Sequence, residues 1–204
     1  MTGHHGERTN RPVALVTDDF RLYHKLVPVL ESQGLRVVGL RPGDPVPPAV
    51  QVLLGGPADD PRSVPLRTDP DAVLLAIYTH LDAPNGYKRV IFGLDPGKVI
   101  GLAVVADGDW LLVAEAMSVP QAVDRVVAWT DGLAARSWEA HVGAGAPKVG
   151  RALLAALRAR LPQAACMLVP EEDTTPGTPV TGSRHTDAAV HIALRRPRMP
   201  EPGP

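Results

Sequence analysis

Hydrophobic and polar positions alternate most clearly between Val90 and Val105, where the sequence reads VIFGLDPGKVIGLAVV. In the first half, Val90, Phe92 and Leu94 fall on one face of a predicted strand and Asp95 falls on the other. A Pro-Gly turn and a second apolar run follow, which predicts two strands joined by a tight turn. An acid at the end of an apolar strand is costly to bury unless its charge is used. Asp95 is therefore the first candidate functional residue; an exposed turn Asp in a plain hairpin is the alternative.

The pattern after residue 88 predicts three strands followed by helix, strand, helix, strand and helix. The Asp107-Gly108 pair between alternating neighbours is a hairpin signal, so the first three strands are expected to form an antiparallel meander. The expected strands are 90–94, 100–106, 110–116, 137–142 and 165–169, and the expected helices are 120–135, 148–161 and 186–195.

A small parallel α/β unit is predicted over residues 12–85, with a boundary near residues 83–88. Its expected strands are 13–16, 35–40 and 49–54, its expected helices are 20–32 and 71–81, and a proline-rich loop covers 58–69. Asp18 and Asp19 precede the first helix, where we expect them to cap it.

The order of this unit resembles a response-regulator receiver or a small Rossmann-like half, with Asp18 and Asp19 where a receiver keeps its acidic pair. The third strand, however, runs into Gly55-Gly56-Pro57 and offers no Asp to accept a phosphoryl group. No glycine fingerprint for a dinucleotide follows the first strand either. The capping role is therefore favoured over a catalytic one.

Composition narrows the class of protein. The 204 residues carry a net charge of −1 and 45% hydrophobic residues, as expected for a globular protein. The single Cys166 excludes an intramolecular disulfide and a multi-cysteine zinc site, so a reducing cytoplasm is the expected location. No apolar run reaches the roughly 20 residues needed to span a bilayer. Residues 1–11 and 197–204 are expected to be tails.

Two motifs at the ends of residues 90–195 resemble those of one family. Asp95-Pro96-Gly97 after an apolar strand, with Gly101 opening the next strand, resembles the first motif of the RuvC Holliday-junction resolvase branch of the ribonuclease H-like superfamily. The segment 184–194, RHTDAAVHIAL, is similar to that family's last helix, in which an Asp followed by small residues closes a metal site. The resemblance implies a ribonuclease H-like fold: three antiparallel strands, then helix, strand, helix, strand and helix, over residues 88–196.

The resemblance also implies a reaction, which is hydrolysis of phosphodiesters with two Mg²⁺ or Mn²⁺ ions held by converging carboxylates. It implies Asp95, Glu139 and Asp187 as metal ligands and catalytic residues, with His185 as a further catalytic residue. Glu139 is chosen because it lies on the fourth strand, and His141, on the same face, is a possible substitute. Glu171, Glu172 and Asp173 after the fifth strand are another possible source of a ligand, although a solvated loop explains them as well.

Basic residues supply candidate contacts to phosphates, with a solvated helix face as the alternative explanation. Aromatic residues make up only 4% of the chain, which favours recognition of the nucleic-acid backbone or shape over base stacking. The expected partner is branched DNA, bound by a homodimer because a junction resolvase must cut two symmetric strands. The candidate nucleic-acid-binding residues are Lys98, Lys148, Arg151, Arg158 and Arg184.

Three functions therefore remain open. The first is a metal-dependent endonuclease resembling RuvC. The second is a non-catalytic ribonuclease H-like module that binds nucleic acid or protein. The third is a phosphotransferase of the actin and sugar-kinase type, which is placed last because that superfamily duplicates the fold and this chain has room for one copy.

Overall fold

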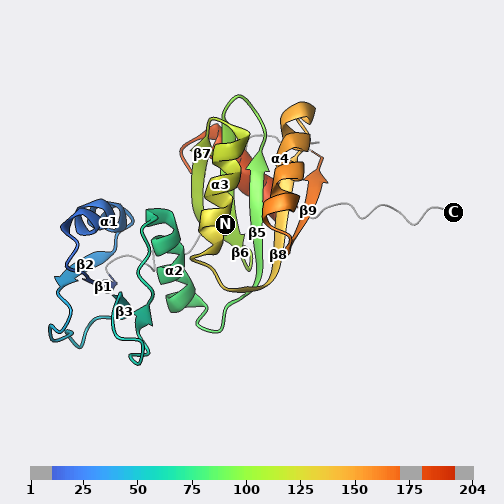
Figure 1. The fold of residues 1–204 in the computed structure, drawn as a ribbon. Helices are drawn as coiled ribbons and strands as arrows, with labels where there is room; N and C mark the ends of the chain where they lie inside the picture. Colours follow the sequence, from blue (N-terminus) through green and yellow to red (C-terminus); the bar gives the residue numbers. More distant parts are fainter. Residues whose placement is uncertain (1–10, 171–180, 196–204) are drawn as a thin grey trace. The chain divides into compact units, whose positions relative to one another are not determined.

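The computed structural model describes residues 11–170 and 181–195, so all but Arg11 of the two expected tails lies outside the described part. The chain divides into two compact units, each described separately below (Figure 1). The first unit comprises the chain up to Gly86 together with Ala128–Ala134, and the second comprises Tyr87–Val127 together with the chain from Ala135 onward. One sheet is parallel and the other is mixed, so the protein is of the α/β class. Among the described residues, no helix is long and apolar enough to cross a membrane.

The first unit is a four-stranded parallel sheet in the order β2-β1-β3-β4, as the predicted parallel α/β unit requires. One prediction was wrong: the segment expected as a loop contains a short edge strand, β4, which pairs with β3. The elements of this unit are β1 (Pro12–Val16), α1 (Phe20–Ser32), β2 (Arg36–Leu40), β3 (Val52–Leu54), β4 (Ser63–Val64) and α2 (Pro70–Asp82).

Carboxylates cap both helices of this unit. Asp19 Oδ1 accepts hydrogen bonds from the backbone N–H of Arg21 at 2.8 Å and of Leu22 at 3.1 Å, so the predicted cap of α1 is confirmed for this residue. Asp69 caps α2 through the N–H of Ala72 at 2.9 Å. Asp18 takes no part in the cap of α1 and lines a pocket instead.

The segment 128–134 packs on α2 and completes the first unit. Trp129 is fully buried and donates its indole N–H to Asp71 Oδ2 at 3.0 Å, while the Thr79 hydroxyl donates to the carbonyl of Gly132 at 3.1 Å. The helix expected over 120–135 ends at Thr130, because the next residues form tight turns back to the last helical carbonyls.

The second unit is a five-stranded mixed sheet in the order β7-β6-β5-β8-β9. β5, β6 and β7 are antiparallel, as predicted, whereas β8 and β9 run parallel to β5. Its elements are β5 (Tyr87–Asp95), β6 (Ile100–Ala106), β7 (Asp109–Ala116), α3 (Val119–Thr130), β8 (Ala135–Gly143), α4 (Pro147–Arg160), β9 (Ala164–Val169) and α5 (Arg184–Leu194).

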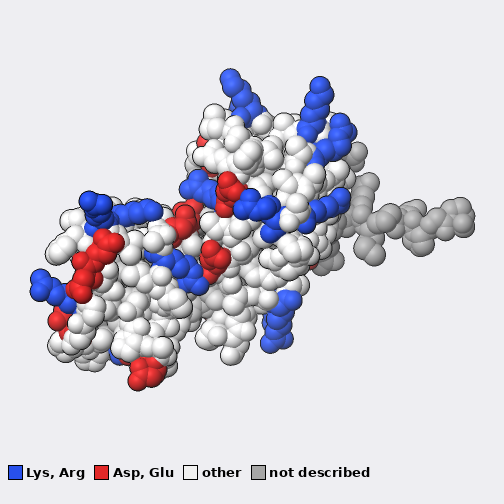
Figure 2. Space-filling model, in the orientation of Figure 1, with Lys and Arg blue, Asp and Glu red and all other residues white. Residues whose placement is uncertain are grey.

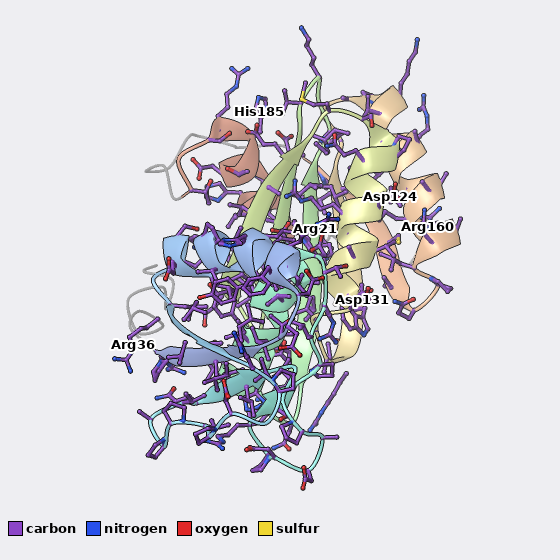
Figure 3. The ribbon with its side chains drawn as sticks, turned by 60° about the vertical axis from the view of Figure 1, so that its left-hand side comes forward. Arg21, Arg36, Asp124, Asp131, Arg160 and His185 are labelled. Atoms are coloured by element: carbon purple, nitrogen blue, oxygen red, sulfur yellow. The ribbon has the colours of Figure 1, made fainter. Side chains whose placement is uncertain are left out.

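Helices cover both faces of this sheet, with α3 and α4 on one side and α5 on the other (Figure 1). Val90, Phe92 and Leu94 of β5 are fully buried on the first face, as the alternation predicts. Arg160 of α4 donates to Asp124 of α3 at 3.0 Å, and both residues are labelled in Figure 3. Both side chains are largely exposed, so this pair contributes little to stability.

On the opposite face of the sheet, the backbone of α5 lies very close to β5 and β6. A Cβ atom on Gly93 would overlap the carbonyl oxygen of Ala189, and one on Gly101 would overlap the carbonyl oxygen of His185. α5 therefore rests directly on the β5–β6 ladder, where Asp95 pairs with Gly101.

We predict that Gly101→Ala destabilises the protein by about 1–3 kcal/mol or more, since backbone and not a flexible side chain blocks the added methyl group. The measurement is the free energy of unfolding by urea titration. Gly150→Ala is the matched control, because Gly150 is a buried glycine inside α4 whose Cβ would meet its nearest atom at 3.3 Å. A gain in helix propensity offsets that tight contact. Equal stability of Gly101→Ala and wild type would contradict the close approach of α5.

Candidate functional site

The carboxyl end of β5 brings together two of the residues singled out from the sequence. Asp95 is the last residue of β5 and its side chain is 20% exposed. His185, in the first turn of α5, has Nδ1 3.7 Å from Asp95 Oδ2, within reach of an ion pair but longer than a hydrogen bond. The bare backbone of Gly101 permits this approach, because the carbonyl of His185 lies against it.

Asp187 also lies in the first turn of α5, where it orders the chain before the helix. Its Oδ1 accepts hydrogen bonds from the backbone N–H of Thr181 at 2.7 Å and from the Thr181 hydroxyl at 2.8 Å. Ser183 caps the helix by accepting from the N–H of His185 at 3.3 Å. Part of the hydrogen-bonding capacity of Asp187 is therefore used by Thr181, which precedes the helix.

Glu139 lies elsewhere on the same sheet face. It pairs with Ile91, four residues before Asp95, which places it about 13 Å along the strand from that acid. Arg89 Nε and Nη2 each donate to its carboxylate at 2.6 Å, and the ring of His141 contacts it through Nε2 at 2.9 Å. The Arg89 guanidinium first, and then His141, hold the pKa of Glu139 below its usual 4.5, against the opposing effect of burial.

His141, the possible substitute ligand, is fully buried beneath α5. Its Nδ1 lies 3.3 Å from the carbonyl oxygen of Ile192, and its other nitrogen faces Glu139. The salt bridge of Arg89, Glu139 and His141 thus forms one network across the sheet face.

The carboxylate set of a two-metal site is not assembled by these residues. Within residues 11–170 and 181–195, no group of three or more His, Cys, Asp or Glu side chains could hold a metal ion. β8, the parallel neighbour of β5, ends in Val142-Gly143 and provides no acid beside Asp95. Glu171, Glu172 and Asp173 lie outside the described residues. The described residues therefore do not fit the metal centre that the resemblance implies.

Basic side chains surround the end of the sheet at which Asp95 lies. Lys98 is in the β5–β6 turn, Lys148 and Arg151 are near the start of α4 directly after β8, and Arg184 begins α5. All four are exposed, and Figure 2 shows Lys and Arg side chains projecting from the upper end of the second unit. Arg158 lies two turns further along α4 and donates to the carbonyl of Cys166 at 3.2 Å, so it stands apart from the other four. We call Lys98, Lys148, Arg151 and Arg184 the basic rim.

The corresponding edge of the first unit has no acid on β3. β3 ends at Leu54 and continues into Gly55, which has φ +74° and lies so close to the carbonyl of Val16 that a Cβ would be 2.8 Å from it. Glycine is required there by backbone geometry. The position at which a receiver would accept a phosphoryl group is therefore not available for that chemistry.

Comparison with known proteins finds a likeness for the first unit. Residues 12–83 match the family model described as a response regulator receiver-like domain. The match agrees with the likeness that the strand–helix–strand order and the Asp18-Asp19 pair indicated. No curated protein and no solved structure matches the chain.

We predict that Glu139→Gln lowers stability by about 1–2 kcal/mol at neutral pH, since it removes a charged partner of Arg89 and His141. The pKa of Glu139 is lowered in the folded protein, so its contribution is complete above the ordinary value of 4.5 and is lost as the pH falls through the folded-state pKa. The difference in unfolding free energy between wild type and variant is expected to shrink below pH 4.5 in urea titrations.

The control for this prediction is Asp124→Asn, whose exposed pair with Arg160 is expected to contribute little at any pH. A Glu139→Gln difference that stays constant as the pH falls would contradict the role of the network.

Proposed function

We propose that the second unit is a ribonuclease H-like domain of the RuvC-like kind, and that it binds structured nucleic acid without cleaving it. The strand order β7-β6-β5-β8-β9, with α3 and α4 on one face and α5 on the other, supports this fold assignment. The observation that carries the functional proposal is the basic rim, which places four exposed cations at one end of the sheet around Asp95 and His185.

Phosphate backbones are the ligand that such a rim suits best. Exposed Lys and Arg side chains neutralise phosphates and release counterions, which makes binding strong at low salt and weak at high salt. Aromatic residues make up only 4% of the chain, so contacts to the backbone are favoured over stacking on bases. Because the cations come from three different segments, they suit a substrate whose strands diverge, such as a branched duplex.

The proposal excludes cleavage because the carboxylates that would have to hold two metal ions lie apart. Glu139 is neutralised by Arg89 and lies about 13 Å along the strand from Asp95. Asp95 Oδ2 lies 3.7 Å from His185 Nδ1, and among residues 11–170 and 181–195 no group of three or more His, Cys, Asp or Glu side chains could hold a metal ion.

We predict that Lys98→Gln combined with Arg184→Gln weakens binding of a labelled four-way DNA junction and lowers the slope of log K against log salt by about 1–2. Fluorescence anisotropy over a series of salt concentrations measures both quantities. Arg136→Gln is the matched control, because Arg136 is exposed but lies at the amino end of β8, away from the rim. Equal losses in the control and the rim variant would count against the rim as the binding surface.

The Mg²⁺- or Mn²⁺-dependent endonuclease is the second candidate function. The approach of Asp95 and His185, with Asp187 in the same helical turn, favours it. The homodimer expected of a junction resolvase belongs to this candidate.

A cleavage assay separates the two candidates. Labelled four-way junction, flap, duplex and RNA–DNA hybrid are incubated with wild type and Asp95→Asn in Mg²⁺ or Mn²⁺. We expect no metal-dependent cutting by either protein, because the described carboxylates do not converge, while both proteins still bind the junction. Cutting by wild type that disappears in Asp95→Asn would overturn the binding-only proposal and establish the endonuclease.

A further inference from the structure

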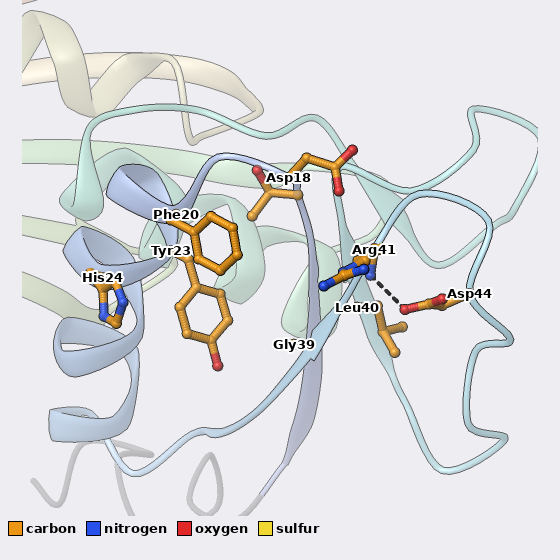
Figure 4. Close-up of a pocket in the computed structure, with 9 residues that line it drawn as sticks. Asp18, Phe20, Tyr23, His24, Gly39, Leu40, Arg41 and Asp44 are labelled. Carbon is orange, nitrogen blue, oxygen red and sulfur yellow. Dashed lines mark hydrogen bonds between the residues drawn. The ribbon is translucent and has the colours of Figure 1, made fainter.

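The first unit contains a hollow of about 540 Å³ at the carboxyl ends of β1 and β2, beside the start of α1 (Figure 4). Its volume is within the range of about 300–1,000 Å³ that small-molecule sites occupy. The hollow lies away from the end of β3, where a receiver would accept a phosphoryl group, so that chemistry does not account for it.

One wall of the hollow is aromatic. Phe20 is 72% exposed although it is a large apolar residue, and Tyr23 lies beside it, one helical turn further along α1. The ring of His24 packs edge-on against Tyr23, with the ring centroids 5.7 Å apart. A Cβ on Gly39 would lie 2.8 Å from Tyr23 Cε2, so the bare backbone of β2 is what lets the Tyr23 ring lie there.

The other side of the hollow carries opposite charges. Arg41 follows β2, and its side chain points toward the aromatic wall (Figure 4). Its backbone N–H donates to Asp44 at 2.8 Å, which fixes the turn, while its guanidinium forms no hydrogen bond or ion pair within the described part of the chain. Asp18 lies at the upper edge of the hollow, on the Arg41 side, with its carboxylate directed away from the rings (Figure 4), and among the same residues this carboxylate has no partner. An open aromatic wall and an available guanidinium therefore face one hollow, and an available carboxylate lies at its edge.

We infer that this hollow binds a nucleotide. A planar base stacks on Phe20 and Tyr23, the phosphate pairs with the guanidinium of Arg41, and Asp18 accepts hydrogen bonds from sugar hydroxyl groups. The guanidinium of Arg41 attracts a phosphate, so the phosphate lies at the Arg41 end and the base at the aromatic wall, which gives the ligand one orientation. The same chemistry is offered by a free mononucleotide and by an unpaired nucleotide of a strand.

Titration of the full-length protein with AMP, CMP, GMP or UMP, and with adenosine and inorganic phosphate separately, tests this site. Amide resonances of residues 17–24 and 39–44 are followed in ¹H–¹⁵N spectra, and affinities are measured by isothermal titration calorimetry. We expect the mononucleotides to shift these resonances and to bind more tightly than adenosine or phosphate alone. No shift of these resonances by any mononucleotide would overturn the inference.

Two variants assign the roles. Phe20→Leu keeps an apolar side chain but removes stacking, and we expect it to weaken AMP binding about tenfold. Arg41→Gln is expected to weaken AMP binding about tenfold while leaving adenosine binding nearly unchanged. Arg36→Gln is the control, because Arg36 is exposed at the start of β2, outside the hollow. Wild-type affinity in both pocket variants would contradict the assignment.

A third titration distinguishes the two sources. A short single-stranded oligonucleotide is compared with AMP in the Lys98→Gln, Arg184→Gln background, in which the basic rim is weakened. Tighter binding of the oligonucleotide that is lost in Arg41→Gln identifies a nucleotide of a strand as the ligand. If the oligonucleotide binds as tightly as AMP or more weakly, the free nucleotide is identified as the ligand.

Discussion

The contact between the backbone of α5 and the middle of the five-stranded sheet determines where the chemistry of the second unit lies. Gly93 and Gly101 leave no room for a Cβ under the carbonyls of Ala189 and His185, so the helix lies directly on β5 and β6. A side chain at either glycine would lift the helix and with it His185, which lies 3.7 Å from Asp95. Asp95 and His185 therefore lie close together because of this packing, and not because of any local sequence motif.

The network of Arg89, Glu139 and His141 is the second consequence of that packing. α5 buries His141 completely, and a buried polar ring requires hydrogen-bond partners. Its two nitrogens face the carboxylate of Glu139 at 2.9 Å and the carbonyl of Ile192 at 3.3 Å. Both partners are acceptors, so a neutral ring donates to only one of them and an imidazolium to both. Glu139 therefore provides a hydrogen-bond partner for the buried ring of His141, and Arg89 compensates the negative charge of Glu139.

The order and type of the long elements could be predicted from the sequence, because their apolar periodicity and caps agree. The helix 20–32 and the strand 100–106 have the predicted bounds. β4 was missed because two residues of strand carry no period, and the end of α3 was missed because its turns depend on packing against α2. Strand alternation assigned Glu139 to the correct face but says nothing about register. Only the pairing of Glu139 with Ile91 shows that it lies beside Arg89 and not beside Asp95.

The hollow beside α1 could not be predicted from the sequence at all, because Phe20, Gly39 and Arg41 come from a helix, a strand and a turn. The carboxyl-end edges of the two sheets share one pattern. In each unit one strand leads to an acid, Asp18 after β1 and Asp95 at the end of β5, and the neighbouring parallel strand leads to glycine where a second acid would serve to hold a cation.

Arginine or lysine is present at both edges instead, as Arg41 in the first unit and as the basic rim in the second. Two carboxylates would bind an anionic ligand through a bridging metal ion, whereas a guanidinium or an ammonium group binds a phosphate directly. Glycine at the position of a second acid, with cations nearby, is therefore what both proposals, direct binding of phosphates at each edge without their hydrolysis, would require.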